Sequence, residues 1–181
     1  MKNNLQYPAV FTRLFPGFFE DPGISRLPPE FVFAELVLPL SDVRDEQLQA
    51  PCPGDIAFGF YRGDLARLRD AVRQVEPDWV QYFSETDRVL CGFDGTRPVS
   101  FCQLTDFGQY ESLRIGGPGC VGTLPEYRGR GIGLSMVGKA TSLLKEEGFD
   151  LSWIHYTHLE HWYGKLGYRT VLRWNSRGIR S

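Results

Sequence analysis

The sequence has little of what marks secreted or membrane-embedded chains. Its four cysteines include no Cys-x-x-Cys pair. The first eight residues, Met-Lys-Asn-Asn-Leu-Gln-Tyr-Pro, hold no apolar signal core, and no apolar run approaches the length of a bilayer span. We therefore expect reduced thiols, a cytoplasmic location and no membrane partner.

The sequence also has no large excess of charge of either sign. The formal net charge of −2 and the pI of about 5.9 give no general attraction to nucleic acid or anionic lipid. We therefore expect no nucleic-acid partner. A length of 181 residues with 42% hydrophobic composition is enough for one well-packed domain with a short extension.

What stands out is a basic, glycine-rich stretch over residues 122–133. Pro125 helps to end a strand before it, because proline cannot donate to a central ladder, and residues 132–147 have one apolar face typical of an amphipathic helix. The first N–H groups of such a helix have no intrahelical partner. Backbone N–H groups free of side-chain obstruction are expected at Arg128, Gly129, Gly131 and Gly133. With the helix dipole, they predict a diphosphate site.

Two other glycine motifs fit this region less well. Gly133-x-x-x-x-Gly138-Lys139 has the skeleton of a P-loop, but Ala140 stands where a hydroxyl should hold magnesium. A dinucleotide fingerprint fails because Met136 stands in place of its third glycine. A turn that merely joins strand to helix is the remaining alternative.

The run Arg128-Gly-Arg-Gly131-Ile-Gly133, preceded by Leu-Pro-Glu-Tyr, resembles the Arg/Gln-x-x-Gly-x-Gly/Ala signature of the GNAT superfamily of acyl-CoA-dependent N-acetyltransferases. The resemblance implies an α/β fold, with a mixed, mostly antiparallel central sheet flanked by helices and splayed fourth and fifth strands. It covers the chain from about residue 55, which predicts an N-terminal extension over 1–54 and a GNAT domain over 55–181.

The resemblance also implies acetyl-CoA as co-substrate, with its pyrophosphate on the loop and its pantetheine between the splayed strands. Several glycines within 109–123 favour a bulge there. Arg128 and Arg130 would neutralise the phosphates, although Arg130 could equally be a solvated loop residue. The implied cofactor-binding set is Val121, Gly122, Thr123, Arg128, Gly129, Arg130, Gly131, Ile132 and Gly133.

Residues 157–168 resemble the last helix of the family, which places Tyr163 near the CoA sulfur as general acid. A phenol is protonated at neutral pH and can pass its proton to a departing thiolate. The alternative is a buried aromatic residue whose hydroxyl only completes the packing. The glutamate that the family often uses as base has a counterpart only in Glu111, which lies too far upstream.

The three histidines of the chain, His155, His158 and His161, fall in one short segment. No carboxylate or cysteine signature completes a metal site with them, so we expect no metal. His155 or His158 could serve as general base, because imidazole titrates near neutral pH.

Residues 30–39 form a β-prone run after several turn signals, and residues 41–54 have the composition of a linker. The last predicted strand, over 167–174, leaves little room for the usual seventh strand of the family. Residues 31–38 could supply it within their own chain or in that of a partner, which leaves a homodimer open. Alternatively, they form an accessory strand that covers a sheet edge.

Together these features predict an N-acetyltransferase that moves an acetyl group from acetyl-CoA to a primary amine, by direct attack of the amine on the thioester. The acceptor would be a small molecule or a peptide. One alternative is a catalytically idle acyl-CoA-binding or dimerisation module, and another is an acyltransferase for longer acyl chains.

Overall fold

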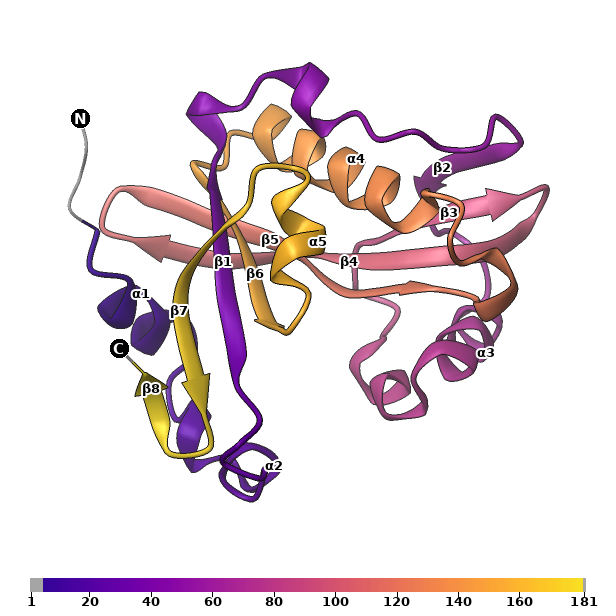
Figure 1. Ribbon diagram of the computed structural model, residues 1–181. Helices are drawn as coiled ribbons and strands as arrows, with labels where there is room; N and C mark the ends of the chain where they lie inside the picture. Colours follow the sequence, from indigo (N-terminus) through magenta and orange to yellow (C-terminus); the bar gives the residue numbers. More distant parts are fainter. Residues whose placement is uncertain (1–4, 181) are drawn as a thin grey trace.

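A single eight-stranded sheet organises residues 5–180, the part of the chain that the computed structural model describes (Figure 1). Its strand order is β2-β3-β4-β5-β6-β1-β7-β8, and all paired neighbours are antiparallel except β5 and β6. The strands are β1 (Phe33–Pro39), β2 (Ile56–Phe60), β3 (Val89–Asp94), β4 (Arg97–Tyr110), β5 (Leu113–Thr123), β6 (Leu151–Thr157), β7 (Arg169–Asn175) and β8 (Gly178–Arg180). The predicted mixed, mostly antiparallel sheet is confirmed.

Helices cover both faces of this sheet (Figure 1). The α-helices are α1 (Tyr7–Leu14), α2 (Pro22–Ser25), α3 (Leu65–Val75), α4 (Ile132–Glu146) and α5 (Glu160–Gly164). Short 3-10 turns complete the set, at η1 (Phe18–Glu20), η2 (Leu40–Asp42), η3 (Asp45–Leu48), η4 (Pro77–Tyr82) and η5 (Pro125–Tyr127). No helix in the described residues is long and apolar enough to cross a membrane.

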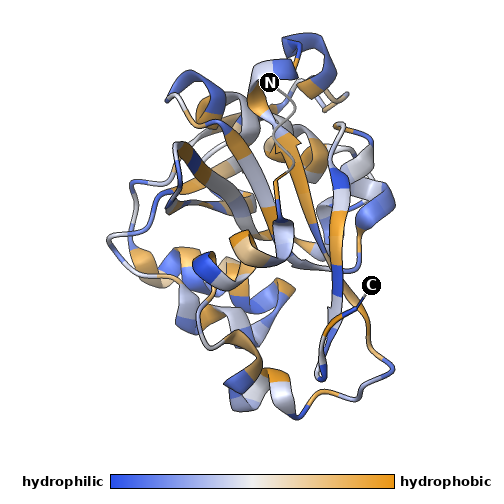
Figure 2. Ribbon diagram, turned by 90° about the vertical axis from the view of Figure 1, so that its left-hand side faces the viewer, coloured by the Kyte–Doolittle hydropathy of each residue, from blue (hydrophilic) through white to orange (hydrophobic). Residues whose placement is uncertain are grey.

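The core has one layer on each face, because successive side chains of a strand point to opposite faces. Leu36 and Ile154 pack with α4 and α5, whereas Val37 and Trp153 pack with α1. In Figure 2 the hydrophobic colour concentrates on the central strands. The burial of these side chains removes apolar surface from water and is the main stabilising contribution to the fold.

Strand β1 lies inside the sheet, between β6 and β7. Val37, for example, lies opposite Trp153 on one side and Arg169 on the other. The prediction that this segment fills a sheet position beside the last long strand is therefore confirmed within its own chain. The alternative that it only covers an edge is wrong, because both of its edges are paired.

Two features of the fold were not predicted. Residues 7–14 form α1, whereas the sequence indicated only the turns that follow it. Pro8 lies in the first turn of this helix, where proline is tolerated, and Phe11 is buried. Strand β4 is also longer than predicted and reaches Tyr110. Glu111 consequently lies at the β4–β5 turn with φ 54°, at the far end of the sheet.

Capping residues mark the ends of two helices. The side chain of Asp64 accepts a hydrogen bond of 2.8 Å from the backbone N–H of Ala66 at the start of α3. Gly148, with φ 78°, follows the end of α4 in the left-handed conformation that favours glycine.

Residues 41–54 pack against α4. Lys145 Nζ donates to the carbonyl of Val43 and to Asp45, at 2.8 Å each. At Gly138 a Cβ would collide with the carbonyl oxygen of Leu48, so only glycine allows this approach. The division of the chain at residue 54 remains a prediction, and residues 1–4 and 181 lie outside the described part.

The position of β1 can be tested by stability. Leu36→Ala should lower the free energy of unfolding by about 2–5 kcal/mol, because it opens a cavity in the core. Leu159→Ala is the matched control, since Leu159 is 45% exposed and Leu36 is 0% exposed; it should change stability by less than about 0.5 kcal/mol. Urea denaturation measures both. Equal losses would contradict a central β1.

Candidate active site

The glycine-rich loop leads from η5 into α4 and leaves a row of backbone donors open. The N–H groups of residues 129–134 donate to no acceptor among the described residues. Gly129 and Gly131 have φ of 76° and 81°, a conformation that favours glycine. Helix α4 adds the positive end of its dipole. The expected N–H of Arg128 does not belong to this row, because it donates to the carbonyl of Pro125 at 3.3 Å.

The two arginines of the loop lie differently. Arg128 Nε donates to the carbonyl of Thr123 at 3.0 Å, and its two terminal nitrogens have no partner among the described residues. Arg130 faces away toward Asp55, at 3.4 Å, and lies over the ring of Tyr127 at 5.4 Å from its centroid. The exposed ion pair with Asp55 is weak. Arg128 is therefore the better placed of the two to meet an anion.

Strands β5 and β6 part soon after they meet. They pair only at Ile115 with Leu151 and at Gly116 with Ser152. Beyond this point β5 contains the predicted bulge, where the β4–β5 register shifts around Cys120. Cys120 and Tyr156, on the two parting strands, have φ of 46° and 57°. Such conformations are rare outside glycine and cost roughly 1–3 kcal/mol each.

The backbone of Val121 and Thr123 faces the opening between these strands. Gly122 pairs with Phe101, and the N–H of Leu124 donates to Val99 at 2.9 Å. Because backbone groups alternate along an antiparallel strand, the groups of Val121 and Thr123 point away from β4. Ser100 Oγ fixes this edge by donating to the Gly122 carbonyl at 2.8 Å.

Gly133 allows the start of α4 to approach β5 and α5 closely. A Cβ at this position would lie 3.1 Å from Thr123 Oγ1 and 3.5 Å from the ring of Trp162. The first turn of α4 therefore faces Thr123 from β5 and Trp162 from α5. The end of β5, the row of N–H groups and the last helix meet at this point.

Tyr163 lies in α5 with only 5% of its surface exposed. Burial raises its pKa, and the neighbouring Tyr168, Cys102 and Cys120 groups add to the effect, which places the phenol near the bulge of β5. Its hydroxyl makes no hydrogen bond to a described residue. Because no buried side-chain oxygen or nitrogen in the described chain lacks a partner, this hydroxyl must reach accessible space.

The structure separates the three histidines. His158 and His161 are exposed and have no described hydrogen-bond partner. His155 is 23% exposed, lies 2.9 Å from Glu35 through Nδ1, and stacks on Phe15 with 3.9 Å between ring centroids. Among the described residues no group of His, Cys, Asp or Glu side chains is arranged to hold a metal.

His155 and Tyr163 belong to opposite faces of the sheet. His155 packs with α1 and the turn that follows it, and Tyr163 packs with β1, α4 and α5. Glu35 was missed by sequence reasoning, and its only signal was one charge in an otherwise apolar run over 31–38.

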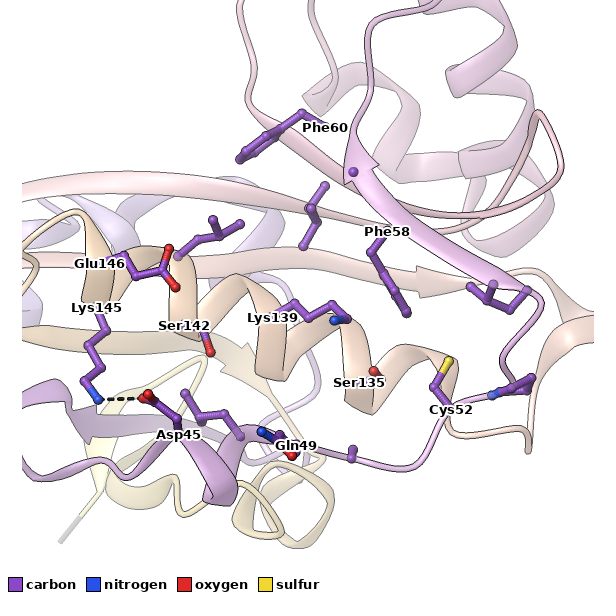
Figure 3. A pocket seen from close by; sticks show the side chains of 17 residues that line it. Asp45, Gln49, Cys52, Phe58, Phe60, Ser135, Lys139, Ser142, Lys145 and Glu146 are labelled. Atoms are coloured by element: carbon purple, nitrogen blue, oxygen red, sulfur yellow. Dashed lines mark hydrogen bonds and ion pairs between the residues drawn. The ribbon is translucent and has the colours of Figure 1, made fainter.

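A hollow in the described residues lies away from this site. It has a volume of about 1010 Å³ and is bounded by α4, β2 and the segment over 45–53 (Figure 3). Lys139 points into it from α4, and the Lys145–Asp45 ion pair lies at one end. It contains none of the predicted site residues.

Residues 65–171 match the family described as acetyltransferase (GNAT) domain. This match spans more than half of the chain, so the protein belongs to the GNAT acetyltransferase family. Members of this family typically use acetyl-CoA. Strand β1 and the helix before it lie outside the matched residues. A comparison with curated proteins found no match.

Solved structures show the same fold. A GCN5-related glucosamine N-acetyltransferase region of a fungal multi-domain GH3 β-N-acetylglucosaminidase matches with TM-score 0.67 and 20% identity over 80% of this chain and 20% of that one. A GCN5-related N-acetyltransferase from Sphaerobacter thermophilus matches with TM-score 0.59 and 17% identity, over 80% and 50%. A tandem GNAT protein from the clavulanic acid biosynthesis pathway matches with TM-score 0.59 and 10% identity, over 80% and 51%. This chain thus spans a fifth to about half of their length.

The thiol beside the cleft should be slow to react. Burial, with the nearby charge of Asp87, raises the pKa of Cys120 to about 11 from an ordinary 9.0. Its thiolate should therefore be roughly 100-fold scarcer than usual at pH 8. Alkylation of the native protein by iodoacetamide, followed by mass spectrometry of the Cys120 peptide, should accelerate about tenfold per pH unit from pH 8 to 10.

The urea-unfolded protein is the control for this titration. In it the alkylation rate should level off near an ordinary thiol pKa of about 8.5. A native rate that levels off at the same pH would contradict the raised pKa.

Proposed function

We propose that this protein transfers an acetyl group from acetyl-CoA to a primary amine by direct attack of the amine on the thioester. The observation that carries the proposal is the row of unpaired N–H groups over 129–134, which opens α4 beside the gap between β5 and β6. Anions bind at such helix starts because donors and dipole point the same way. Family membership supports the acyltransferase class.

The residues present fit acetyl-CoA. The N–H groups from Gly129 onward and the free end of Arg128 would hold the pyrophosphate, and the missing side chain at Gly133 would let it come close to the start of α4. The outward backbone of Val121 and Thr123 would pair with the pantetheine. Arg130 would lie outside this pyrophosphate site, since its guanidinium faces Asp55.

The chain supplies an acid for the leaving group. In the transfer, the amine nitrogen bonds to the thioester carbon, the carbon–sulfur bond breaks, and the sulfur needs a proton. Tyr163 would donate it, because its raised pKa keeps the phenol protonated and its hydroxyl is free. A backbone N–H near Val121 would stabilise the oxyanion.

The chain also supplies a base for the amine. Of the two histidines expected from the sequence, His155 is held in one orientation by Glu35 and Phe15, whereas His158 is exposed. A fixed imidazole is the better base, so we assign the amine proton to His155. The raised pKa of Cys120 disfavours a route through an acylated thiol, which supports direct attack.

Other features of the proposal come from the sequence. The acceptor would be a small molecule or a peptide with a primary amine, and the protein would act in the cytoplasm, without nucleic acid or membrane as partners. A homodimer and the division at residue 54 remain predictions. Occupancy of the sheet position by the chain's own β1 removes the reason that the sequence offered for a dimer.

Calorimetric titration with acetyl-CoA, followed by a thiol-release assay over a panel of amines, amino acids and peptides, tests the proposal. Gly133→Ala should weaken acetyl-CoA binding about 10- to 100-fold, the loss expected for one charge-assisted hydrogen bond. The new Cβ would lie 3.1 Å from Thr123 Oγ1, at the start of α4 where the pyrophosphate would bind. Alanine is favoured in helices, so the variant should remain folded.

Gly59→Ala is the control, because a Cβ at Gly59 of β2 meets nothing within 4 Å. It should bind acetyl-CoA like the wild type. No binding by the wild type would overturn the proposal. Binding without turnover on any amine would favour the idle acyl-CoA-binding module.

Tyr163→Phe should lower kcat by about 100-fold or more, since it removes the general acid, and should leave the acetyl-CoA Kd unchanged. Tyr168→Phe is the matched control. Tyr168 is also buried, but its hydroxyl bonds to Thr141 at 2.8 Å and to Ser152 at 2.7 Å. Its removal should cost about 0.5–1.5 kcal/mol of stability and leave kcat nearly unchanged. If Tyr163→Phe kept the wild-type kcat, Tyr163 would have no role as acid.

A further inference from the structure

Glu35 is a carboxylate in the middle of the sheet, with 0% of its surface exposed. Burial of a charge is costly unless hydrogen bonds replace the lost water. Three N–H donors supply such bonds: Trp153 Nε1 at 2.6 Å, Trp174 Nε1 at 2.7 Å and the backbone N–H of Tyr156 at 3.1 Å. The fourth group in contact is His155 Nδ1, at 2.9 Å.

This network determines which nitrogen of His155 carries the proton. Indole and backbone N–H groups can only donate, so the Glu35 oxygens accept from all three, as an ionised carboxylate does. His155 Nδ1 must then donate as well. In the neutral ring the lone pair is consequently on Nε2, at the opposite side of the imidazole.

The imidazole ring of His155 is held at Nδ1, whereas Nε2 is accessible. Phe15 stacks on it with an interplanar angle of 12°, and Phe18 meets it edge-on with 5.0 Å between centroids. His155 Nε2 has no hydrogen-bond partner among the described residues. Since the described part of the chain has no buried side-chain nitrogen without a partner, Nε2 must be accessible.

We infer that Glu35 is a positioning residue for the acetyl transfer, which holds the Nδ1–H of His155 so that the Nε2 lone pair faces the acceptor amine. This inference rests on the proposed function. As the amine attacks, the lone pair of its nitrogen forms the new carbon–nitrogen bond, and one N–H proton of the amine moves to Nε2 of His155. The Glu35 carboxylate stabilises the resulting imidazolium without taking the proton, which passes to solvent.

The inference extends the site beyond the matched family residues. Glu35 lies in β1, and Phe15 and Phe18 follow α1, all outside residues 65–171. His155 lies inside them. The N-terminal segment would then complete the site as well as the sheet. The competing explanation is that Glu35 only ties β1 to its two neighbouring strands through the indole groups of Trp153 and Trp174.

Glu35→Gln in the full chain separates these explanations. The amide NH₂ can donate to Nδ1, which would transfer the ring proton to Nε2 and remove the lone pair from the amine. We expect kcat to fall about 100-fold, as for loss of a general base, with the acetyl-CoA Kd unchanged. Tyr168→Phe is the control, because it removes buried hydrogen bonds to Thr141 and Ser152 without touching Glu35 or His155. It should lower stability and keep kcat within about threefold.

A double mutant tests whether the two residues act as one unit. Because Glu35 acts through His155, the Glu35→Gln/His155→Gln variant should be no slower than His155→Gln alone. Additive losses would overturn the inference. An unchanged kcat in Glu35→Gln, with a wild type that turns over, would overturn it and leave the proposed function standing.

Nitrogen-15 NMR of the His155 ring gives a readout that needs no substrate. The wild-type neutral ring should carry its proton on Nδ1, and Glu35→Gln should move it to Nε2. A wild-type proton on Nε2 would overturn the inference directly. If instead no amine is turned over, the proposed function fails. The spectrum still tests the assignment of the proton to Nδ1, because it needs no turnover.

Discussion

The pairing of β1 with β6 on one side and β7 on the other is the constraint on which the rest of the structure depends. It joins strands far apart in the chain into one sheet and gives each face a continuous core. It also brings the segment before β1 onto one face and the segment after it onto α4. Residues 5–54 are thus part of the same packing as the matched family residues.

The site arises where this otherwise continuous sheet opens. Strands β5 and β6 share two paired positions and then separate, with Cys120 and Tyr156 in the left-handed conformation on either side. The separation leaves backbone donors and acceptors unpaired in the middle of the sheet, where they would normally be satisfied. In the proposed reaction, Tyr163 would act from one face of the sheet and His155 from the other.

Burial has different consequences for the polar groups around this opening. The thiol of Cys120 and the phenol of Tyr163 have few charged partners, so burial raises their pKa and keeps them protonated. Glu35 is buried more completely but receives hydrogen bonds from four groups. These bonds replace the water that the carboxylate loses on burial, and the bond to Nδ1 can orient the imidazole of His155.

The sequence by itself determined the features that depend on neighbouring residues. The glycine-rich loop, the start of α4, Asp64 as a helix cap and the bulge in β5 all follow from local backbone preferences, and the structure has each of them. Only the tertiary structure decided which histidine is fixed, because the partner of His155 is 120 residues away along the chain. It likewise decided that β1 lies inside the sheet, since a β-prone run does not specify its neighbours. Local preferences act within a few residues, whereas strand pairing and buried polar networks depend on how the whole chain packs.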